Sequence, residues 1–235
     1  MSELLFRFKK FEVLQSENVF KIGTDAVLLG VATNCDGAAN ILDVGTGTGL
    51  IALMLAQRSK AYIYAIDINP EACLLAKKNV ENSVFHDRIT VKNSSLQKYF
   101  PDIKFDLIIS NPPYFTSGMI APNKNRALAR HDIELSINDF VENSYRLLSD
   151  NGRVAVILPD KQSEEYVKTS VNVGLFLRSK LIIFPKEGMR PVRIITEMSK
   201  IDGDISEKSL TIEKSKRHDY TEEYINLTAD YYLKF

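Results

Sequence analysis

The residues Asn111-Pro112-Pro113-Tyr114 are the clearest chemical motif in this chain. The side-chain oxygen of Asn111 and the carbonyl of Pro112 can each accept an N–H hydrogen bond. Both prolines fix φ at about −65° and so hold these acceptors in place. Tyr114 offers a face on which a flat ring can stack. The motif therefore suits a planar group that carries an exocyclic amine, and a proline-rich turn without a ligand is the alternative.

Two apolar runs predict the strands that position this chemistry. Phe105–Ser110 reads as a buried strand that ends at Asn111, and open α/β sheets bind ligands at the carboxyl ends of their strands. The run 41–44 leads into a turn with glycine at positions 45, 47 and 49, followed by a helical pattern from Leu50. Glycines allow a sharp turn and a close backbone approach to a ligand. The spacing is G-x-G-x-G rather than the dinucleotide fingerprint G-x-G-x-x-G/A, so a pyrophosphate site is less well matched.

An acidic residue completes the prediction of a nucleoside site. The run 61–66 reads as the next strand and ends in Asp67, where a carboxylate suits a ribose diol. The alternative is that Asp67 caps the helix that begins at Pro70. This order of elements, from the first strand to Asp67, predicts a nucleoside cofactor. The other interpretation is a glycine turn without a ligand.

Together, these motifs resemble the class I S-adenosylmethionine-dependent methyltransferases, in particular the amino-methyltransferases with an N-P-P-Y motif. The segments 6–11, 21–30 and 105–115 are similar to the bacterial tRNA (adenine-N6)-methyltransferases that act on adenine 37 of a valine tRNA. The similarity extends to the aromatic C-terminus at 231–235. The resemblance implies a Rossmann-like α/β fold, with a seven-stranded, mostly parallel sheet in the order 3-2-1-4-5-7-6 and helices on both faces.

The resemblance also implies roles for individual residues, with S-adenosyl-L-methionine as the cofactor. The catalytic set is Asn111, Pro112, Pro113 and Tyr114. The cofactor-binding set is Thr24, Asp25, Asp43, Gly45, Gly47, Gly49, Asp67, Ser95 and Leu96. The substrate-binding set is Tyr114, Phe115, Arg126 and Arg130.

Several of these assignments have structural alternatives. Asp43 is expected to hydrogen-bond toward the methionine end of the cofactor, or to cap the amides of the glycine loop. Thr24 and Asp25 are expected to cover the cofactor's carboxylate end, or to cap the helix that follows them. Ser95 departs from the family pattern, because many relatives carry an aspartate there for the cofactor's adenine amino group.

Sequence periodicity and turn residues predict the remaining elements. The predicted strands are 41–44, 61–66, 88–92, 105–110, 154–158, 176–184, 192–198 and 209–213, with short strands or a hairpin in 6–22. The predicted helices are 24–32, 50–58, 70–81, 136–148, 163–172 and 221–232, and 119–133 is predicted to be a loop.

Length and charge bound the domain organisation and the partners. The 235 residues predict one methyltransferase domain over 1–235, with an extension at 1–35 covering the cofactor site and the core at 36–235. The formal net charge is zero, which is unexpected for a protein that binds RNA phosphates. Local basic clusters offset this. They are Arg7-Lys9-Lys10, Lys124-Arg126-Arg130-His131, Arg190-Arg193 and Lys214-Lys216-Arg217-His218.

The cysteines and the N-terminus predict the compartment. Cys35 and Cys73 are far apart and show no metal-ligand spacing, so we expect no metal site and free thiols in a cytoplasmic protein. No signal-peptide pattern and no membrane-spanning apolar run are found, which predicts no membrane partner. We expect tRNA as the partner and a monomeric chain.

The predicted reaction is methyl transfer to the exocyclic N6 of an adenine in tRNA, and three alternatives stay open. The same chemistry suits an adenine of ribosomal RNA or DNA, or a protein glutamine amide. A nicotinamide-dependent oxidoreductase with a similar glycine turn is less favoured by Leu50 and by the lack of an evident hydride-transfer set. A non-catalytic nucleotide-binding module is disfavoured by the intact N-P-P-Y motif.

Overall fold

An eight-stranded sheet forms the centre of the protein in the computed structural model, which describes residues 4–16, 19, 22–112 and 135–234. The strand order is β10-β8-β9-β7-β6-β3-β4-β5, and all neighbouring pairs are parallel except the two that β9 makes. The strands are β3 Asn40–Val44, β4 Tyr62–Asp67, β5 Ile89–Asn93, β6 Phe105–Ser110, β7 Leu148–Leu158, β8 Phe176–Lys186, β9 Arg193–Ser199 and β10 Ser206–Glu213.

The predicted strand order is present, and one strand is added to it. Read from β5, the order β5-β4-β3-β6-β7-β9-β8 is the expected 3-2-1-4-5-7-6. The expected count of seven strands is wrong for this chain, because β10 pairs with β8 in parallel as an eighth strand. An outer strand without a partner exposes a row of N–H and C=O groups, and β10 satisfies those of β8.

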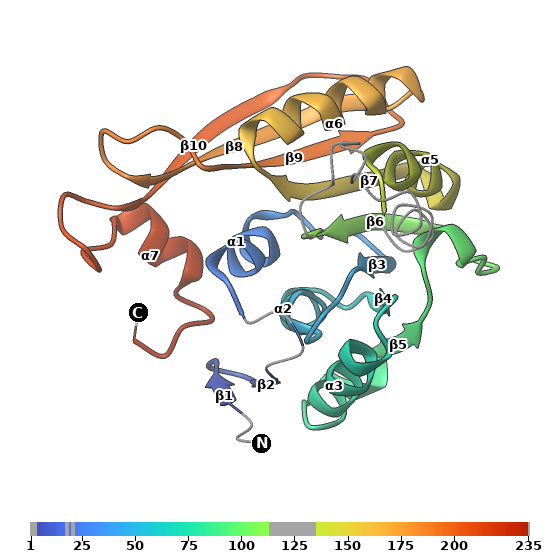
Figure 1. Ribbon diagram of the computed structural model, residues 1–235, viewed down its shortest axis with the longest axis horizontal. Coiled ribbons are helices and arrows are strands. Elements are labelled where there is room, and N and C mark those ends of the chain that lie inside the picture. The colour runs from blue at the N-terminus through green and yellow to red at the C-terminus, as the bar shows by residue number, and fades with distance from the viewer. Residues whose placement is uncertain (1–3, 17–18, 20–21, 113–134, 235) are drawn as a thin grey trace, which may run out of the picture.

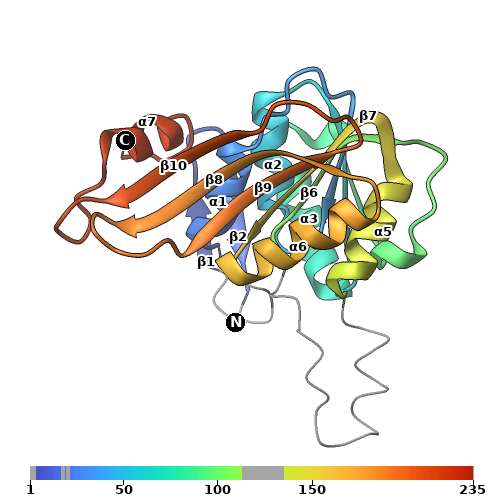
Figure 2. The same cartoon turned by 90° about the horizontal axis from the view of Figure 1, so that it is seen from above.

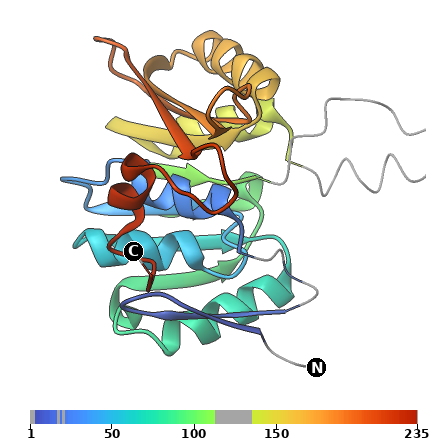
Figure 3. The same ribbon diagram turned by 90° about the vertical axis from the view of Figure 1, so that its left-hand side faces the viewer.

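Helices cover both faces of the sheet, as Figure 1 and Figure 3 show. One face is covered by four helices and by the antiparallel hairpin of β1 Leu4–Arg7 and β2 Glu12–Gln15. The four helices are α1 Thr24–Ala32, α2 Leu50–Arg58, α3 Pro70–Glu81 and α7 Glu222–Thr228. The other face is covered by α5 Ile137–Leu147, α6 Asp160–Asn172 and the short helix η2 Leu96–Lys98. The short helix η1 His86–Arg88 precedes β5. None of the helices among the described residues has the length and apolar character needed to cross a membrane.

The sheet separates two hydrophobic cores. Ile41 and Leu42 are consecutive residues of β3 and both are fully buried, but they belong to different cores. Successive side chains of a strand point to opposite faces, so a strand covered on both sides is apolar throughout. This explains why the predicted core strands read as continuous apolar runs.

Local signals set the beginnings of two helices. The side chain of Asn69 accepts a hydrogen bond from the amide of Glu71 and caps α3, with Pro70 at the first helical position. The side chain of Ser136 caps α5 by accepting from the amide of Asp139 at 3.0 Å. Both boundaries agree with the sequence prediction.

One helix cap and two other boundaries differ from the prediction. Gly23 occupies the N-cap position of α1 without a side-chain hydrogen bond, so Thr24 and Asp25 are not its N-caps. Asn151 and Gly152 lie inside β7, which begins directly after α5; a Cβ at Gly152 would lie 2.7 Å from the carbonyl oxygen of Phe105, so only glycine fits there. Helix α7 ends at Thr228, four residues before the predicted 232.

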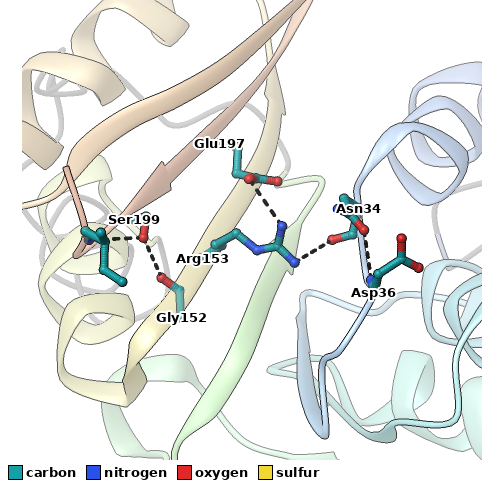
Figure 4. A network of polar contacts seen from close by, with 7 residues as sticks. Asn34, Asp36, Gly152, Arg153, Glu197 and Ser199 are labelled. Atoms are coloured by element: carbon teal, nitrogen blue, oxygen red, sulfur yellow. Dashed lines mark hydrogen bonds and ion pairs between the residues drawn. The ribbon is translucent and has the colours of Figure 1, made fainter. Parts of the chain in front are cut away.

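A polar network links β7, β9 and the loop between α1 and β3 (Figure 4). The guanidinium of Arg153 on β7 lies 3.7 Å from Glu197 on β9 and donates to the carbonyl of Asn34 in the loop after α1 at 3.2 Å. Burial raises the pKa of Glu197, and the neighbouring Arg153 and Arg178 partly offset this. The network therefore joins the end of α1 to the centre of the sheet.

Candidate active site

The strand registers align three predicted site segments at one edge of the sheet. Val44 at the end of β3 pairs with Ile66 of β4 on one side and with Ser110 of β6 on the other. Asp67 follows Ile66 and pairs with Asn93 of β5. The glycine loop, the Asn111 segment and Asp67 therefore meet at the point where the strand order reverses, which is where open α/β sheets bind ligands.

The end of β6 is fixed to the end of β3. The hydroxyl of Ser110, which is buried, donates to the carbonyl of Val44 at 2.8 Å. Asn111 follows as a half-buried residue, and Pro112 is buried. This places the first two residues of the N-P-P-Y motif beside the glycine loop. The predicted site residues Pro113, Tyr114, Phe115, Arg126 and Arg130 lie outside the described residues, as does the predicted loop 119–133.

The glycine loop has a backbone that only glycine adopts without strain. The φ angles of Gly45, Gly47 and Gly49 are +72°, +56° and +80°. Apart from the adjoining residues of the chain, no atom of the described residues lies within 4 Å of the point where a Cβ would stand at Gly45 or Gly47, so this part of the protein leaves the backbone open to a ligand. Gly49 packs more tightly, because its Cβ would lie 3.4 Å from the Cβ of Ala76 on α3.

Asp43 is a fully buried carboxyl group beneath this loop. Its Oδ2 accepts a hydrogen bond from the Thr46 hydroxyl at 2.6 Å, while its buried Oδ1 has no well-formed hydrogen bond within the described residues. Burial raises the pKa of Asp43 to about 7; the Thr46 hydrogen bond and the backbone of Ala52 lower it, and the charge of Asp67 raises it. Asp43 thus supports the loop through the hydroxyl of Thr46, while its second oxygen is buried.

Asp67 connects the glycine loop to the start of α3. Its Oδ2 accepts from the amide of Gly47 and its Oδ1 from the amide of Asn69, both at 2.9 Å. The helix-capping alternative for Asp67 is wrong, because Asn69 caps α3. Each carboxylate oxygen has a further lone pair, so Asp67 can also accept from ribose hydroxyls.

Ser95 and Leu96 lie in the next segment along this edge, after β5. Ser95 is half-buried and precedes η2, and its carbonyl accepts from the Ser94 hydroxyl at 3.0 Å. The side chain of Leu96 is 3% exposed and packs in the same core as Tyr99 and Phe105. Only a small part of Leu96 is therefore available to a ligand.

These residues fit a nucleoside cofactor that carries positive charge. The open backbone at Gly45 and Gly47 gives room for close approach, and Asp43 places a carboxyl group beneath the loop, whose ionised form favours a cation nearby. Asp67 supplies acceptors for a ribose. These carboxyl groups and the open loop suit S-adenosylmethionine, whose sulfonium and ammonium groups are cationic.

Comparison with known proteins identifies the family. The family model described as methyltransferase small domain matches residues 6–172. The chain belongs to this methyltransferase family. It is 42% identical to a tRNA1(Val) (adenine(37)-N6)-methyltransferase of Parabacteroides distasonis, with all of both chains covered. It is 44% identical to the protein of the same name from Trichodesmium erythraeum, with 98% of each chain covered.

Solved structures show the same fold for this methyltransferase. A predicted O-methyltransferase of Agrobacterium tumefaciens superposes with a TM-score of 0.68 at 20% identity, over 88% of this chain and 96% of that one. A methyltransferase of Pyrococcus furiosus superposes with a TM-score of 0.60 at 20% identity, over 81% and 89% of the two chains. The class I methyltransferase fold predicted from the sequence is confirmed.

Asp25 of this methyltransferase makes a contact that the sequence did not predict. Its Oδ2 accepts from Nε of Arg193 on β9 at 2.7 Å, and the two side chains are 33% and 22% exposed. Thr24 beside it is exposed. The pair joins the start of α1 to the start of β9, so Arg193, a sequence candidate for phosphate binding, has a partner within the chain.

Asn79 is the site-supporting residue that sequence reasoning missed. It lies on α3 and is 1% exposed. Its amide nitrogen donates to the carbonyls of Thr48 and Leu14 at 2.8 and 3.0 Å, and its oxygen accepts from the amide of Leu14 at 2.8 Å. It therefore ties the glycine loop to the N-terminal hairpin. Its only sequence signal is a polar residue between apolar positions of a helix.

Replacing Asn79 with alanine is expected to lower the free energy of unfolding by about 1–3 kcal/mol, because buried backbone groups of Leu14 and Thr48 lose their partners. Urea unfolding measures this, and titration with S-adenosylmethionine should show weaker binding because the glycine loop loses its anchor. Asn172→Ala, at the exposed end of α6, is the control. Equal effects of the two substitutions would contradict the role given to Asn79.

Proposed function

We propose that this methyltransferase transfers a methyl group from S-adenosyl-L-methionine to N6 of an adenine in tRNA, and that the adenine is position 37 of tRNA1(Val). The observation that carries the proposal is the full-length similarity to relatives of that name, at 42% and 44% identity. The register that sets Asn111 beside the glycine loop supports it.

Asn111 and Pro112 are proposed to orient the accepting nitrogen. The lone pair of an adenine amino group is delocalised into the ring, so the nitrogen is a weak nucleophile. Two acceptors, the Asn111 side-chain oxygen and the Pro112 carbonyl, hold both N–H groups and direct the lone pair toward the donor. They also stabilise the positive charge that develops on nitrogen. Such alignment can contribute on the order of 7–11 kcal/mol to the lowering of the barrier.

The proton balance of this proposal needs no strong base. S-adenosylmethionine, when bound, supplies an electrophilic methyl group on a sulfonium. Asn111 is neutral and cannot take up the proton at ordinary pH. The nitrogen therefore loses its extra proton to water after the transfer.

The cofactor is proposed to lie along the glycine loop. Gly45, Gly47 and Gly49 contact its methionine and ribose through the backbone, Asp43 faces its cationic end, and Asp67 accepts from the ribose hydroxyls. The remaining proposed cofactor contacts are Thr24, Asp25, Ser95 and Leu96. Two hydrogen bonds support the first part, because Thr46 connects the loop to Asp43 and Gly47 connects it to Asp67.

The proposed substrate is a single-stranded loop of tRNA. A base must leave its stack before it reaches Asn111, and this costs less in a loop than in a duplex. The proposed base contacts are Tyr114 by stacking and Phe115 as an apolar wall, and the proposed phosphate contacts are Arg126 and Arg130. Stacking on an aromatic ring contributes about 1–3 kcal/mol. A cytoplasmic location and a monomeric state remain predictions of the sequence.

Labelled methyl transfer tests the function directly. The protein is incubated with radiolabelled S-adenosylmethionine and total tRNA from a strain that lacks this gene, and the product is digested to nucleosides. We expect label in N6-methyladenosine, mapped to the position next to the anticodon of one valine tRNA. Label only in ribosomal RNA, DNA or protein glutamine would keep the chemistry and overturn the substrate. No transfer to any of them would overturn the function.

A further inference from the structure

The sheet register brings two turns together beyond the ends of β8 and β10. Lys186, the last residue of β8, pairs with Glu213, the last residue of β10. The amide of Glu187 donates to the carbonyl of Glu213 at 3.1 Å, so the turn after β8 lies against the turn after β10. Figures 1 and 2 show both turns at the ends of these long strands, near α7. We call residues 186–192 and 214–219 the two-turn surface.

The two-turn surface is basic on a chain of zero net charge. It contains five Lys or Arg residues against two acidic residues, an excess of three positive charges with His218 neutral, or of two when the adjacent Glu213 is counted. The basic residues are Lys186, Arg190, Lys214, Lys216 and Arg217. Three of them, Arg190, Lys216 and Arg217, are exposed. Neither turn alone carries this excess, and only the pairing of β8 with β10 assembles it.

Hydrogen bonds give both turns a defined shape. In the second turn the amide of Lys214 donates to the carbonyl of Asp219 at 2.7 Å, and the amide of His218 donates to Glu213 at 2.9 Å. In the first turn the amide of Val192 donates to the carbonyl of Ile183 at 2.9 Å. A surface with a preformed backbone loses less conformational freedom on binding a partner.

Several residues of the other basic clusters are engaged by the protein itself. Arg7 forms an ion pair with Glu12 at 2.8 Å within the N-terminal hairpin. The ammonium of Lys9 donates to the carbonyl of Ala229 at 2.6 Å, and Arg193 is paired with Asp25. In the two-turn surface Lys214 lies 3.6 Å from Asp219, but Arg190, Lys216 and Arg217 are exposed and form no ion pair among the described residues. These three side chains are therefore suited to an external anion.

We propose that the two-turn surface binds backbone phosphates of the RNA substrate at a point remote from the target adenine. This inference rests on the proposed function. The carboxyl ends of β8 and β10 belong to the same edge of the sheet as Asn111, and β10 is four strand spacings from β6, which is about 19 Å across the sheet. A phosphate contact at that separation fixes the position of the whole RNA and does not select the base.

The triple variant Arg190→Ala/Lys216→Ala/Arg217→Ala tests this surface. Affinity for full-length unmodified tRNA is measured at several salt concentrations, together with KM for tRNA and affinity for S-adenosylmethionine. We expect the slope of log affinity against log salt to fall by about 1 for each lost phosphate contact, and KM for tRNA to rise about tenfold or more. Cofactor affinity and the thermal unfolding midpoint should stay at the wild-type values.

A matched control separates local binding from total charge. Lys60→Ala/Lys77→Ala/Lys168→Ala also removes three charges, from exposed positions outside the two turns, and its salt slope should equal that of the wild type. If the wild type methylates tRNA and the triple variant keeps its salt slope and KM, the surface inference is wrong and the proposed function stands. If the wild type transfers no methyl group to tRNA, the proposed function fails and this inference falls with it.

Discussion

Alanine at position 111 is expected to lower kcat for methyl transfer about 10²–10³-fold, the range typical for losing one hydrogen-bonding group that stabilises developing charge. Binding of S-adenosylmethionine should be nearly unchanged, because the glycine loop and its two aspartates remain. Single-turnover kinetics with labelled cofactor measures the chemical step, and calorimetric titration measures cofactor binding. The Ser110 hydroxyl still fixes the end of β6 to β3, so the strand should keep its position.

Two companion variants make this result specific. Asn111→Asp keeps an oxygen acceptor at the same place and should retain more activity than Asn111→Ala. Asp67→Ala should weaken cofactor binding first, because it removes the acceptor of the Gly47 amide and the proposed ribose contact. Equal loss of cofactor binding in Asn111→Ala and Asp67→Ala would contradict the separate roles proposed for the two residues.

Asp43 should make the stability of the protein depend on pH. Its pKa is about 7 in the folded protein, against about 3.9 in an unfolded chain. The folded state thus holds a proton that the unfolded state has lost between these two values. The contribution of Asp43 to stability is fully present below about pH 4 and falls as the pH rises to about 7, because a buried carboxylate then forms without a paired cation.

Asp43→Asn removes this dependence while keeping an acceptor for the Thr46 hydroxyl. The free energy of unfolding of Asp43→Asn relative to wild type should therefore rise by about 3 kcal/mol from pH 5 to pH 8. Urea unfolding of both proteins at the two pH values measures the difference. A difference that is the same at both values would contradict a raised pKa.

The same titration should appear in cofactor binding. A cationic ligand near Asp43 favours the carboxylate, so the affinity of the wild type for S-adenosylmethionine should increase with pH below about 7 and level off above it. In Asp43→Asn the affinity should be weaker, and the part of its pH dependence that comes from position 43 should be lost. This readout separates a role toward the cofactor from a purely structural role beneath the loop.

Local patterns in the sequence determined much of the scaffold. The strand Phe105–Ser110 and the helices Thr24–Ala32 and Pro70–Glu81 have the predicted boundaries. Apolar continuity, a proline at the first helical turn and a nearby capping side chain are set by neighbouring residues, so they can be read without the fold. The glycine turn was predicted for the same reason, because its positive φ angles restrict the residue type.

Contacts between distant residues could not be read in this way. Asp25 and Arg193 are 168 positions apart, and Asn79 holds Leu14 from 65 positions away. The pairing of β10 with β8, which adds the eighth strand and brings two basic turns together, also depends on which sheet edge is open. The role of Asp67 could not be predicted from the sequence either, because an aspartate suits both helix capping and support of the glycine loop. The structure decides between them, since Asn69 caps α3.

The sequence by itself determined the class of fold and the glycine loop, because strand runs and turn residues are local properties, and the chemistry of the N-P-P-Y motif stays a prediction. The tertiary structure alone decided that Asp43 is fully buried beneath the glycine loop, and that Asn79 anchors the loop. Burial and hydrogen-bond partners arise only when the sheet, α3 and the N-terminal hairpin pack together. The raised pKa of Asp43 is a consequence of that packing.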